Sequence, residues 1–372
     1  MKNLLLICSV VLIVSACKSR EDAHIISINS FSETSNASIL TDFFDSLDIL
    51  PLDFHDYFYD NMSLAYKESG DYFAIQDWNK SIRVFNKQGV LQTTISAIGR
   101  GPGEYRVIDD FNLSEKQIKA LCNHEKIVSY SLSGEYLEEK YLGFPANNFA
   151  VYNDTSLIFW VPRHSESQYG TDRIVVTDKE GNVRNSFLPL FNQAVAFGTA
   201  MVPIKIKGKN RILCRQYYDP NIYIIDDKDV ISTYSIDFKN KALTDKFVHC
   251  ANMDEAAEEM QTMQAYFIST AYESEKAMIM TVVYQDKMDS GKGAYWLINK
   301  KTNNSKVCFY SIEDEVFQLL GYPLYITDNN SVLFIAETEK YNNLKGKYPI
   351  LASNTEYCNT PYLLLKFHLK TN

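Results

Sequence analysis

Long cationic runs and bilayer-length apolar runs are both missing from this sequence. The 37 Lys and Arg residues are outnumbered by 46 Asp and Glu residues, so the net charge is −9. Nucleic acids bind proteins through basic surfaces that displace counterions from phosphates, so this balance argues against a nucleic-acid partner. Glycine (15) and proline (10) are scarce among 372 residues, which argues against a disordered chain. We therefore expect a packed globular protein.

Recognised motifs of catalysis and metal binding are absent as well. The sequence has no GxSxG nucleophile elbow, no HExxH zinc site, no EF-hand loop and no CxxC pair. Its six histidines, at positions 24, 55, 124, 164, 249 and 368, are scattered without ligand spacing. We therefore expect neither a cofactor nor a metal ion. A carboxylate pair for glycoside cleavage stays open, because such pairs need proximity in space and not in sequence.

The seven cysteines do not have the pattern of a disulfide framework. Once the first 16 residues are removed and Cys17 is set aside, the remaining cysteines are Cys122, Cys214, Cys250, Cys308 and Cys358. An odd number cannot pair completely, so buried free thiols are the favoured interpretation. A single disulfide among them stays open.

The first 16 residues have the features of a signal peptide. Lys2 is followed by an apolar run, Leu4–Val14, that is too short to span a bilayer. The run ends in Val14-Ser15-Ala16-Cys17, which resembles a bacterial lipobox with Val in place of the usual Leu. We expect acyl chains on Cys17 to anchor the mature chain to a membrane of the cell envelope, with residues 17–40 as a tether. An ordinary secretory signal with an incidental Cys17 is the alternative.

The sequence is rich in aromatic residues, with 25 Tyr and 21 Phe, and it repeats a four-residue apolar segment. The copies start at Ile82, Ile127, Ile174, Ile222, Tyr295 and Tyr362. The first four begin 45, 47 and 48 residues apart, which is the length of a four-stranded propeller blade, and the last two intervals, of 73 and 67 residues, must contain insertions. Because the copies are apolar at nearly every position, each predicts a strand covered on both faces. Six copies predict an all-β, six-bladed β-propeller over residues 41–372.

The residues around the repeated segment support this prediction. Three copies continue into a four-residue turn with Gly in fourth place, at Asn86–Gly89, Ser131–Gly134 and Asp178–Gly181. That pattern suits a hairpin closed by a left-handed residue. The last copy leaves a blade without its fourth strand, so we expect the N-terminal run Leu47–Leu52 to fill the place and close the ring. Within one insertion, Asn252–Glu275 is expected to be helical, because acidic residues crowd its start.

The span from Asp77 to Tyr105 resembles an NHL-type propeller repeat, with its strand, its Gly turn and a Gly-rich loop at Gly99–Tyr105. Together with the lipobox, the Ile49–Leu52 segment and the Tyr362–Lys366 ending, it is similar to the six-bladed β-propeller lipoproteins of Bacteroidetes, an NHL-like or TolB-like group. This resemblance implies a propeller fold and an envelope location, without a common reaction. The usual Pro-rich continuation of the loop is replaced here by Val107–Phe111, so ligand rules of NHL proteins are not transferred.

A propeller gathers two kinds of connection onto one face of its disk: those between second and third strands and those between blades. In this sequence they carry aromatic, cationic and acidic side chains, and the expected ligand-binding residues are Trp78, Arg100, Glu104, Tyr105, His124, Arg163, His164, Tyr217, Tyr218, Asp286 and Tyr341. Such a mixture suits a polar ligand or a sugar. The leading hypothesis is a monomeric, non-catalytic binding or scaffold protein for a glycan, peptide or protein partner. The alternative is a carbohydrate-active lyase or hydrolase that uses the central cleft.

Overall fold

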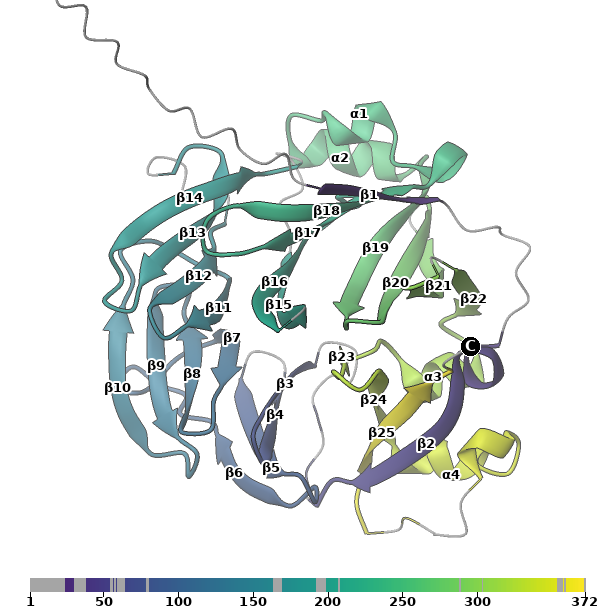
Figure 1. Cartoon of the computed structure of the whole chain (residues 1–372), viewed down its shortest axis with the longest axis horizontal. Helices are drawn as coiled ribbons and strands as arrows, with labels where there is room; N and C mark the ends of the chain where they lie inside the picture. The colour runs from purple at the N-terminus through teal and green to yellow at the C-terminus, as the bar shows by residue number, and fades with distance from the viewer. Residues whose placement is uncertain are drawn as a thin grey trace, which may run out of the picture.

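The computed structural model describes residues 24–29, 38–53, 56, 58, 64–77, 80–162, 169–191, 199–206, 208–287, 289–302, 304–352, 357 and 359–370. In this part of the chain, six sheets stand around one central axis, as the view down that axis in Figure 1 shows. The all-β, six-bladed propeller predicted from the repeated segment is confirmed.

Each blade has four antiparallel strands, and the first of them lies innermost (Figure 1). Blades 1 to 3 are built from β3 (Ala65–Ser69), β4 (Tyr72–Asp77), β5 (Ser81–Asn86) and β6 (Leu91–Ile95); from β7 (Ile108–Leu113), β8 (Gln117–Cys122), β9 (Lys126–Ser131) and β10 (Tyr136–Tyr141); and from β11 (Asn148–Asn153), β12 (Ser156–Trp160), β13 (Asp172–Asp178) and β14 (Val183–Pro189). Blades 4 to 6 are built from β15 (Thr199–Ile206), β16 (Lys209–Gln216), β17 (Asn221–Ile225) and β18 (Val230–Asp237); from β19 (Gln264–Glu273), β20 (Ala277–Asp286), β21 (Asp289–Asn299) and β22 (Ser305–Ser311); and from β23 (Tyr325–Ile326), β24 (Ser331–Glu337), β25 (Tyr362–Leu369) and β2 (Phe44–Pro51).

The repeated apolar segment is the third strand of every blade, in β5, β9, β13, β17, β21 and β25. Neighbouring blades cover both of its faces. In β5, Val84 packs with residues of blade 2, whereas Phe85 packs with Leu333 and Tyr362 of blade 6. Successive side chains of a strand point to opposite faces, so consecutive apolar residues such as Val84 and Phe85 join a blade to both neighbours.

The predicted Gly turns are confirmed by their backbone angles. Gly89, Gly134 and Gly181 have φ values of 79°, 85° and 92°, in the left-handed region that favours glycine. In the first of these turns, the Gly89 N–H donates a 2.9 Å hydrogen bond to the carbonyl oxygen of Asn86. The turns therefore join the third and fourth strands of blades 1 to 3 without strain.

The ring is closed by β2, as the sequence predicts. This strand pairs antiparallel with β25, from Phe44 opposite Leu369 to Pro51 opposite Leu363, and so fills the fourth place of blade 6. It begins three residues earlier than the predicted run. Blade 6 therefore combines β2, the first strand of the ring in the sequence, with β25, the last.

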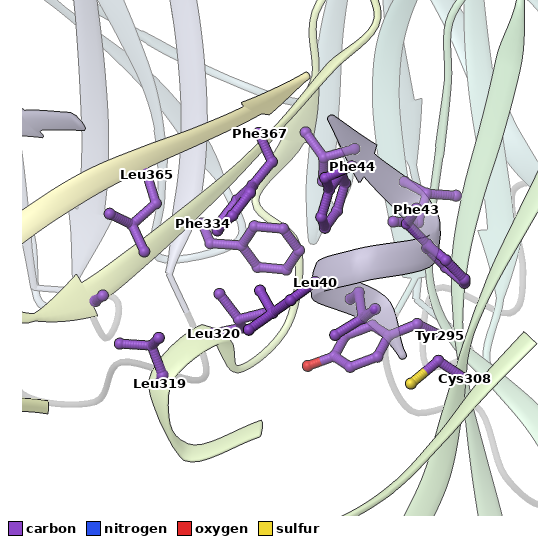
Figure 2. Close-up of a cluster of buried hydrophobic side chains, with 14 of the residues drawn as sticks. Leu40, Phe43, Phe44, Tyr295, Cys308, Leu319, Leu320, Phe334, Leu365 and Phe367 are labelled. Atoms are coloured by element: carbon purple, nitrogen blue, oxygen red, sulfur yellow. The ribbon is translucent and has the colours of Figure 1, made fainter. Parts of the chain in front are cut away.

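Side chains near the start of β2 fill the space between blades 5 and 6, as Figure 2 shows. Phe44 stacks on Phe367 with ring centroids 4.7 Å apart. Leu40 and Phe43, from the preceding η1 turn (Ile39–Phe43), join a buried cluster with Tyr295 of blade 5. The closing strand is thus anchored by apolar packing as well as by its backbone pairing.

An additional strand, β1 (His24–Asn29), lies outside β18 and makes blade 4 five-stranded (Figure 1). It runs parallel to β18. Residues 17–40 are predicted to be a tether, but within them His24–Asn29 form this strand. Residues 1–23, including Cys17 and the expected signal peptide, lie outside the described residues.

The described helices are short and all belong to connections or to the ring closure. They are the π-helical turn η1 before β2, α1 (Asp245–Val248), α2 (Met253–Met260), α3 (Glu315–Leu320), α4 (Thr338–Leu344) and the 3-10 turns η2 (Lys239–Lys241) and η3 (Pro349–Leu351). The predicted helix over Asn252–Glu275 is correct for α2 but wrong beyond it. The residues from Gln264 onward form β19, because blade 5 requires an innermost strand and β20 pairs with these residues from Gln264 to Glu273.

Four of the five remaining cysteines are buried free thiols, namely Cys122, Cys214, Cys250 and Cys308. Cys358 lies outside the described residues. The favoured interpretation of buried thiols is therefore confirmed for these four.

Candidate functional site

The two faces of the disk differ in what they carry. We call "loop face" the side that holds the connections between second and third strands and those between blades, and "turn face" the side that holds the other hairpin turns. All four described α-helices lie in connections of the loop face, since α1 and α2 join blades 4 and 5, α3 joins blades 5 and 6, and α4 joins β24 to β25. In the described part of the chain, the loop face therefore carries the longer connections and all of the α-helices.

Buried charge is also concentrated toward the loop face. Nine Asp, Glu, Lys or Arg residues are buried in the described part of the chain, and eight lie in loop-face connections or in the halves of strands nearest to them: Asp77, Arg83, Asp110, Lys126, Arg173, Arg215, Asp219 and Glu259. The ninth, Glu273, ends β19 at the turn face. Burying charge costs free energy unless partners compensate, so proteins concentrate it where position or function requires it.

The Gly-rich loop between blades 1 and 2 is held by its own residues. Glu104 accepts a 2.7 Å hydrogen bond from the Gly101 N–H. Tyr105 is 0 % exposed, and its hydroxyl donates to the carbonyl oxygens of Lys80 and Ile95 at 2.8 and 3.2 Å. Arg100 is exposed on the same loop. Of the three expected ligand-binding residues here, only Arg100 is presented fully to solvent.

His124 and Asp109 form a pair at the loop-face end of blade 2. The imidazole Nδ1 lies 2.8 Å from Asp109 Oδ1, and the His124 backbone N–H donates to Asp109 Oδ2 at 2.6 Å. The imidazole is 55 % exposed and the carboxylate only 5 %. Burial raises the pKa of Asp109 to about 6, although both contacts with His124 oppose this shift.

The turn that presents His124 has an unusual backbone. Asn123 and His124 both have positive φ, 56° and 61°, and an L-residue other than Asn or Asp rarely adopts this region. The neighbouring thiol of Cys122 is fully buried, and burial raises its pKa to about 12, so it is no nucleophile. A carboxylate that orients an exposed imidazole suits acid–base chemistry, and it is the feature of this face that fits the enzyme alternative.

A second centre lies between blades 4 and 5, beneath the insertion that carries α1 and α2. A cavity of about 110 Å³ opens there. It is lined by Phe191, Tyr218, Pro220, Ile236, Asp237, Phe238, Ala242, Leu243, Val248, Tyr266 and Phe267. Engineered apolar cavities of about 150 Å³ hold benzene, so this one has room for an apolar side chain. Asp237 is the one charged residue in its lining.

Tyr218 is the expected site residue that reaches this cavity. It has a positive φ of 64°, and its ring packs edge-on against Tyr217 at 4.5 Å and Phe247 at 4.9 Å. Such a conformation costs about 1–2 kcal/mol for an L-residue and persists only where the surroundings hold it. The aromatic packing therefore fixes the cavity wall.

One helix of the insertion, α2, is acidic. Helix α2 contains four carboxylates, Asp254, Glu255, Glu258 and Glu259, and no cation. Glu259 bonds to Lys246 of α1 at 2.8 Å, whereas the other three are exposed. Ala256 of α2 packs in one apolar cluster with Tyr218 and Phe267, so this acidic helix lies next to the cavity wall.

The remaining expected site residues are spread around the face. Asp286 is half-buried at the end of β20 and accepts a 2.8 Å hydrogen bond from Gln264 Nε2. Tyr341 is 0 % exposed, and its hydroxyl donates to the Leu351 carbonyl oxygen at 2.6 Å. Trp78, Arg163 and His164 lie outside the described residues. The structure therefore groups Tyr217, Tyr218 and Asp286 around blades 4 and 5, and Glu104, Tyr105 and His124 around blade 2.

Three residues important to these centres are missing from the sequence-based set. Asp109 partners His124, while Asp237 and Phe238 line the cavity. The replacement of the usual Pro-rich continuation by Val107–Phe111 is a signal that could have identified Asp109. Asp237 ends β18 and Phe238 follows it, and neither belongs to a sequence motif, so only the packing of the insertion reveals them.

Within the described residues, no helix is both long and apolar enough to cross a membrane. In the same residues, no three metal-binding side chains gather into a site for an ion.

Solved structures of two other proteins share this fold. A protein described as a candidate exported protein of Bacteroides fragilis superposes with a TM-score of 0.70 at 19 % identity, covering 93 % of this chain and 100 % of its own. A DUF4221 family member from Bacteroides vulgatus superposes with a TM-score of 0.52 at 11 % identity, covering 88 % of this chain and 97 % of its own. At these identities the likeness shows the fold alone. No curated protein matches the sequence. A family match does cover residues 23–359, and the chain belongs to the family described as Domain of unknown function (DUF4934).

Proposed function

We propose that this protein is a binding propeller of the cell envelope, anchored through Cys17, whose loop face captures an apolar side chain flanked by cationic residues of a partner polypeptide. The observation that carries the proposal is the apolar cavity between blades 4 and 5, with Asp237 in its lining and the acidic helix α2 next to its wall. An exported relative in fold and the lipobox-like Val14–Cys17 support the envelope location.

The chemistry of the cavity favours a peptide over a glycan. Its lining is aromatic and aliphatic apart from Asp237, whereas sugars need several convergent polar groups around them. Burying one apolar side chain contributes about 1.5–3 kcal/mol, which corresponds to roughly 10- to 100-fold in affinity. Lys or Arg residues next to this side chain in the peptide would be attracted to the carboxylates of Asp237 and α2, and this attraction would speed association at low salt.

A phage-displayed peptide library panned on the mature chain tests this function. The expected consensus is a Leu, Ile, Phe or Met next to Lys or Arg, with binding that weakens as salt rises. The variant Ala242→Trp fills the opening from an exposed lining position and should lose at least about 10-fold in affinity. Ala257→Trp is the matched control, because Ala257 is exposed on α2 but does not line the cavity.

Two results would contradict the proposal. The first is an acidic or purely polar consensus. The second is a consensus peptide that binds Ala242→Trp as tightly as it binds the unaltered chain.

A further inference from the structure

The strand β1 fixes the side from which the N-terminal tether reaches the propeller. It runs parallel to β18, with His24 opposite Ser232 and Asn29 opposite Asp237. The strand β18 begins after the turn 226–229 on the turn face and ends at the insertion of the loop face. His24 therefore lies at the turn-face end of blade 4, and Asn29 lies at its loop-face end.

The length of the preceding segment limits where the anchor can be. Seven residue steps separate Cys17 from His24, and an extended chain spans at most about 3.3–3.6 Å per residue, so the reach is about 25 Å. The eight residues of β18 span about 26 Å at 3.3 Å per residue. A fully extended tether would use its whole length to climb from the turn-face end of blade 4 to the level of the loop face.

Given the proposed anchor at Cys17, we infer that the protein stands with its turn face toward its own membrane and its loop face away from it. The cavity beneath α1 is then open to partners that are soluble or that project from an opposing surface. It is closed to lipids and to the short external segments of proteins in the same leaflet. The partner polypeptide is accordingly one that reaches the protein from outside its own membrane.

Distances between the protein and the membrane test this orientation. The full-length protein, produced with its lipids and inserted into vesicles with an energy acceptor on the lipid headgroups, carries one bio-orthogonal fluorophore. The matched positions are Lys228 and Asn240, which are exposed at opposite ends of β18. We expect energy transfer to be several-fold stronger from position 228 than from position 240. Equal transfer, or stronger transfer from 240, overturns the orientation.

Two further measurements separate this inference from the anchor on which it rests. A protein that fails to float with vesicles overturns the anchor and the orientation together, whereas one that floats with equal transfer overturns the orientation alone. The double variant Ile26→Pro and Ser27→Pro removes backbone donors from β1 while leaving the closed ring intact. It should still float, and the difference between positions 228 and 240 should shrink because the tether becomes longer. An unchanged difference would show that β1 does not set the orientation.

Discussion

Among single residues, Asp219 shows how burial on the loop face couples stability to pH. Its carboxylate is 1 % exposed and accepts hydrogen bonds from the Asn221 backbone N–H at 2.9 Å and the Tyr223 hydroxyl at 2.6 Å. Burial raises its pKa to about 6, and the hydrogen bonds offset only part of this shift. A raised carboxyl pKa means that the folded state binds the Asp219 proton more tightly than the unfolded state does. The contribution of this proton to the free energy of unfolding is therefore complete below about pH 4 and disappears as pH rises through 6.

The variant Asp219→Asn should therefore flatten the pH dependence of stability. A difference of about two between the folded and unfolded pKa values corresponds to about 3 kcal/mol. This is the largest part of the decrease in the free energy of unfolding between pH 4 and pH 7 that Asp219→Asn can remove. Urea unfolding at several pH values measures it. Asp154→Asn, at an exposed turn position, is the control and should leave the slope as it is. A slope unchanged by Asp219→Asn would show that Asp219 does not titrate in this window.

At the scale of elements, the hairpin turns after the third strands depend on glycine to different degrees. A Cβ atom at Gly89 would lie 2.2 Å from the carbonyl oxygen of Pro51, where β2 leaves blade 6 and passes the turn of blade 1. A Cβ atom at Gly181 would meet only the flexible end of Lys140 at 3.4 Å. Both glycines have positive φ, so an L-residue at either position would be strained. Only at Gly89 would the added Cβ atom also collide with the backbone of another segment.

Gly181→Ala should cost about 1–2 kcal/mol, the price of a left-handed L-residue. Gly89→Ala should cost clearly more, because the new methyl group must displace the end of the closing strand. The free energies of unfolding of the two variants in urea make the comparison. Equal losses would mean that the contact between blade 1 and β2 adds nothing to the backbone preference.

The elements that the sequence predicts well are those with a local or repeating signal. Third strands are apolar at nearly every position because two blades cover them, and β2 is predictable because blade 6 would otherwise lack a fourth strand. The failures have non-local causes. Ala265 and Phe267 lie in a strand because β20 pairs with them, although they follow a helix with a clear N-terminal signal. Asp109 and His124 meet because β7 pairs with β8, which places Ile108 opposite Cys122, and because two positive φ values turn the chain directly after β8.

At the scale of the whole molecule, stability rests on a ring whose last blade pairs the first ring strand in the sequence, β2, with the last, β25. Phe44 of β2 is 1 % exposed and stacks on Phe367, and Phe149 of blade 3 is 0 % exposed and stacks on Phe159 at 6.0 Å. Truncating either ring to Ala should cost about 3–5 kcal/mol in lost burial and cavity formation. The two sites differ in one respect, since only Phe44 belongs to the strand that closes the ring.

Phe149→Ala should lower the melting temperature while leaving one sharp transition, because all six blades remain joined. Phe44→Ala weakens β2, and an opened ring lets blades 6 and 1 unfold before the others. We therefore expect a broader transition, with a van't Hoff enthalpy below the calorimetric enthalpy. Differential scanning calorimetry of the two variants decides the matter. If Phe44→Ala melts as sharply as Phe149→Ala, the ring does not need β2 to unfold as one unit, and the cooperativity must come from the contacts between neighbouring blades alone.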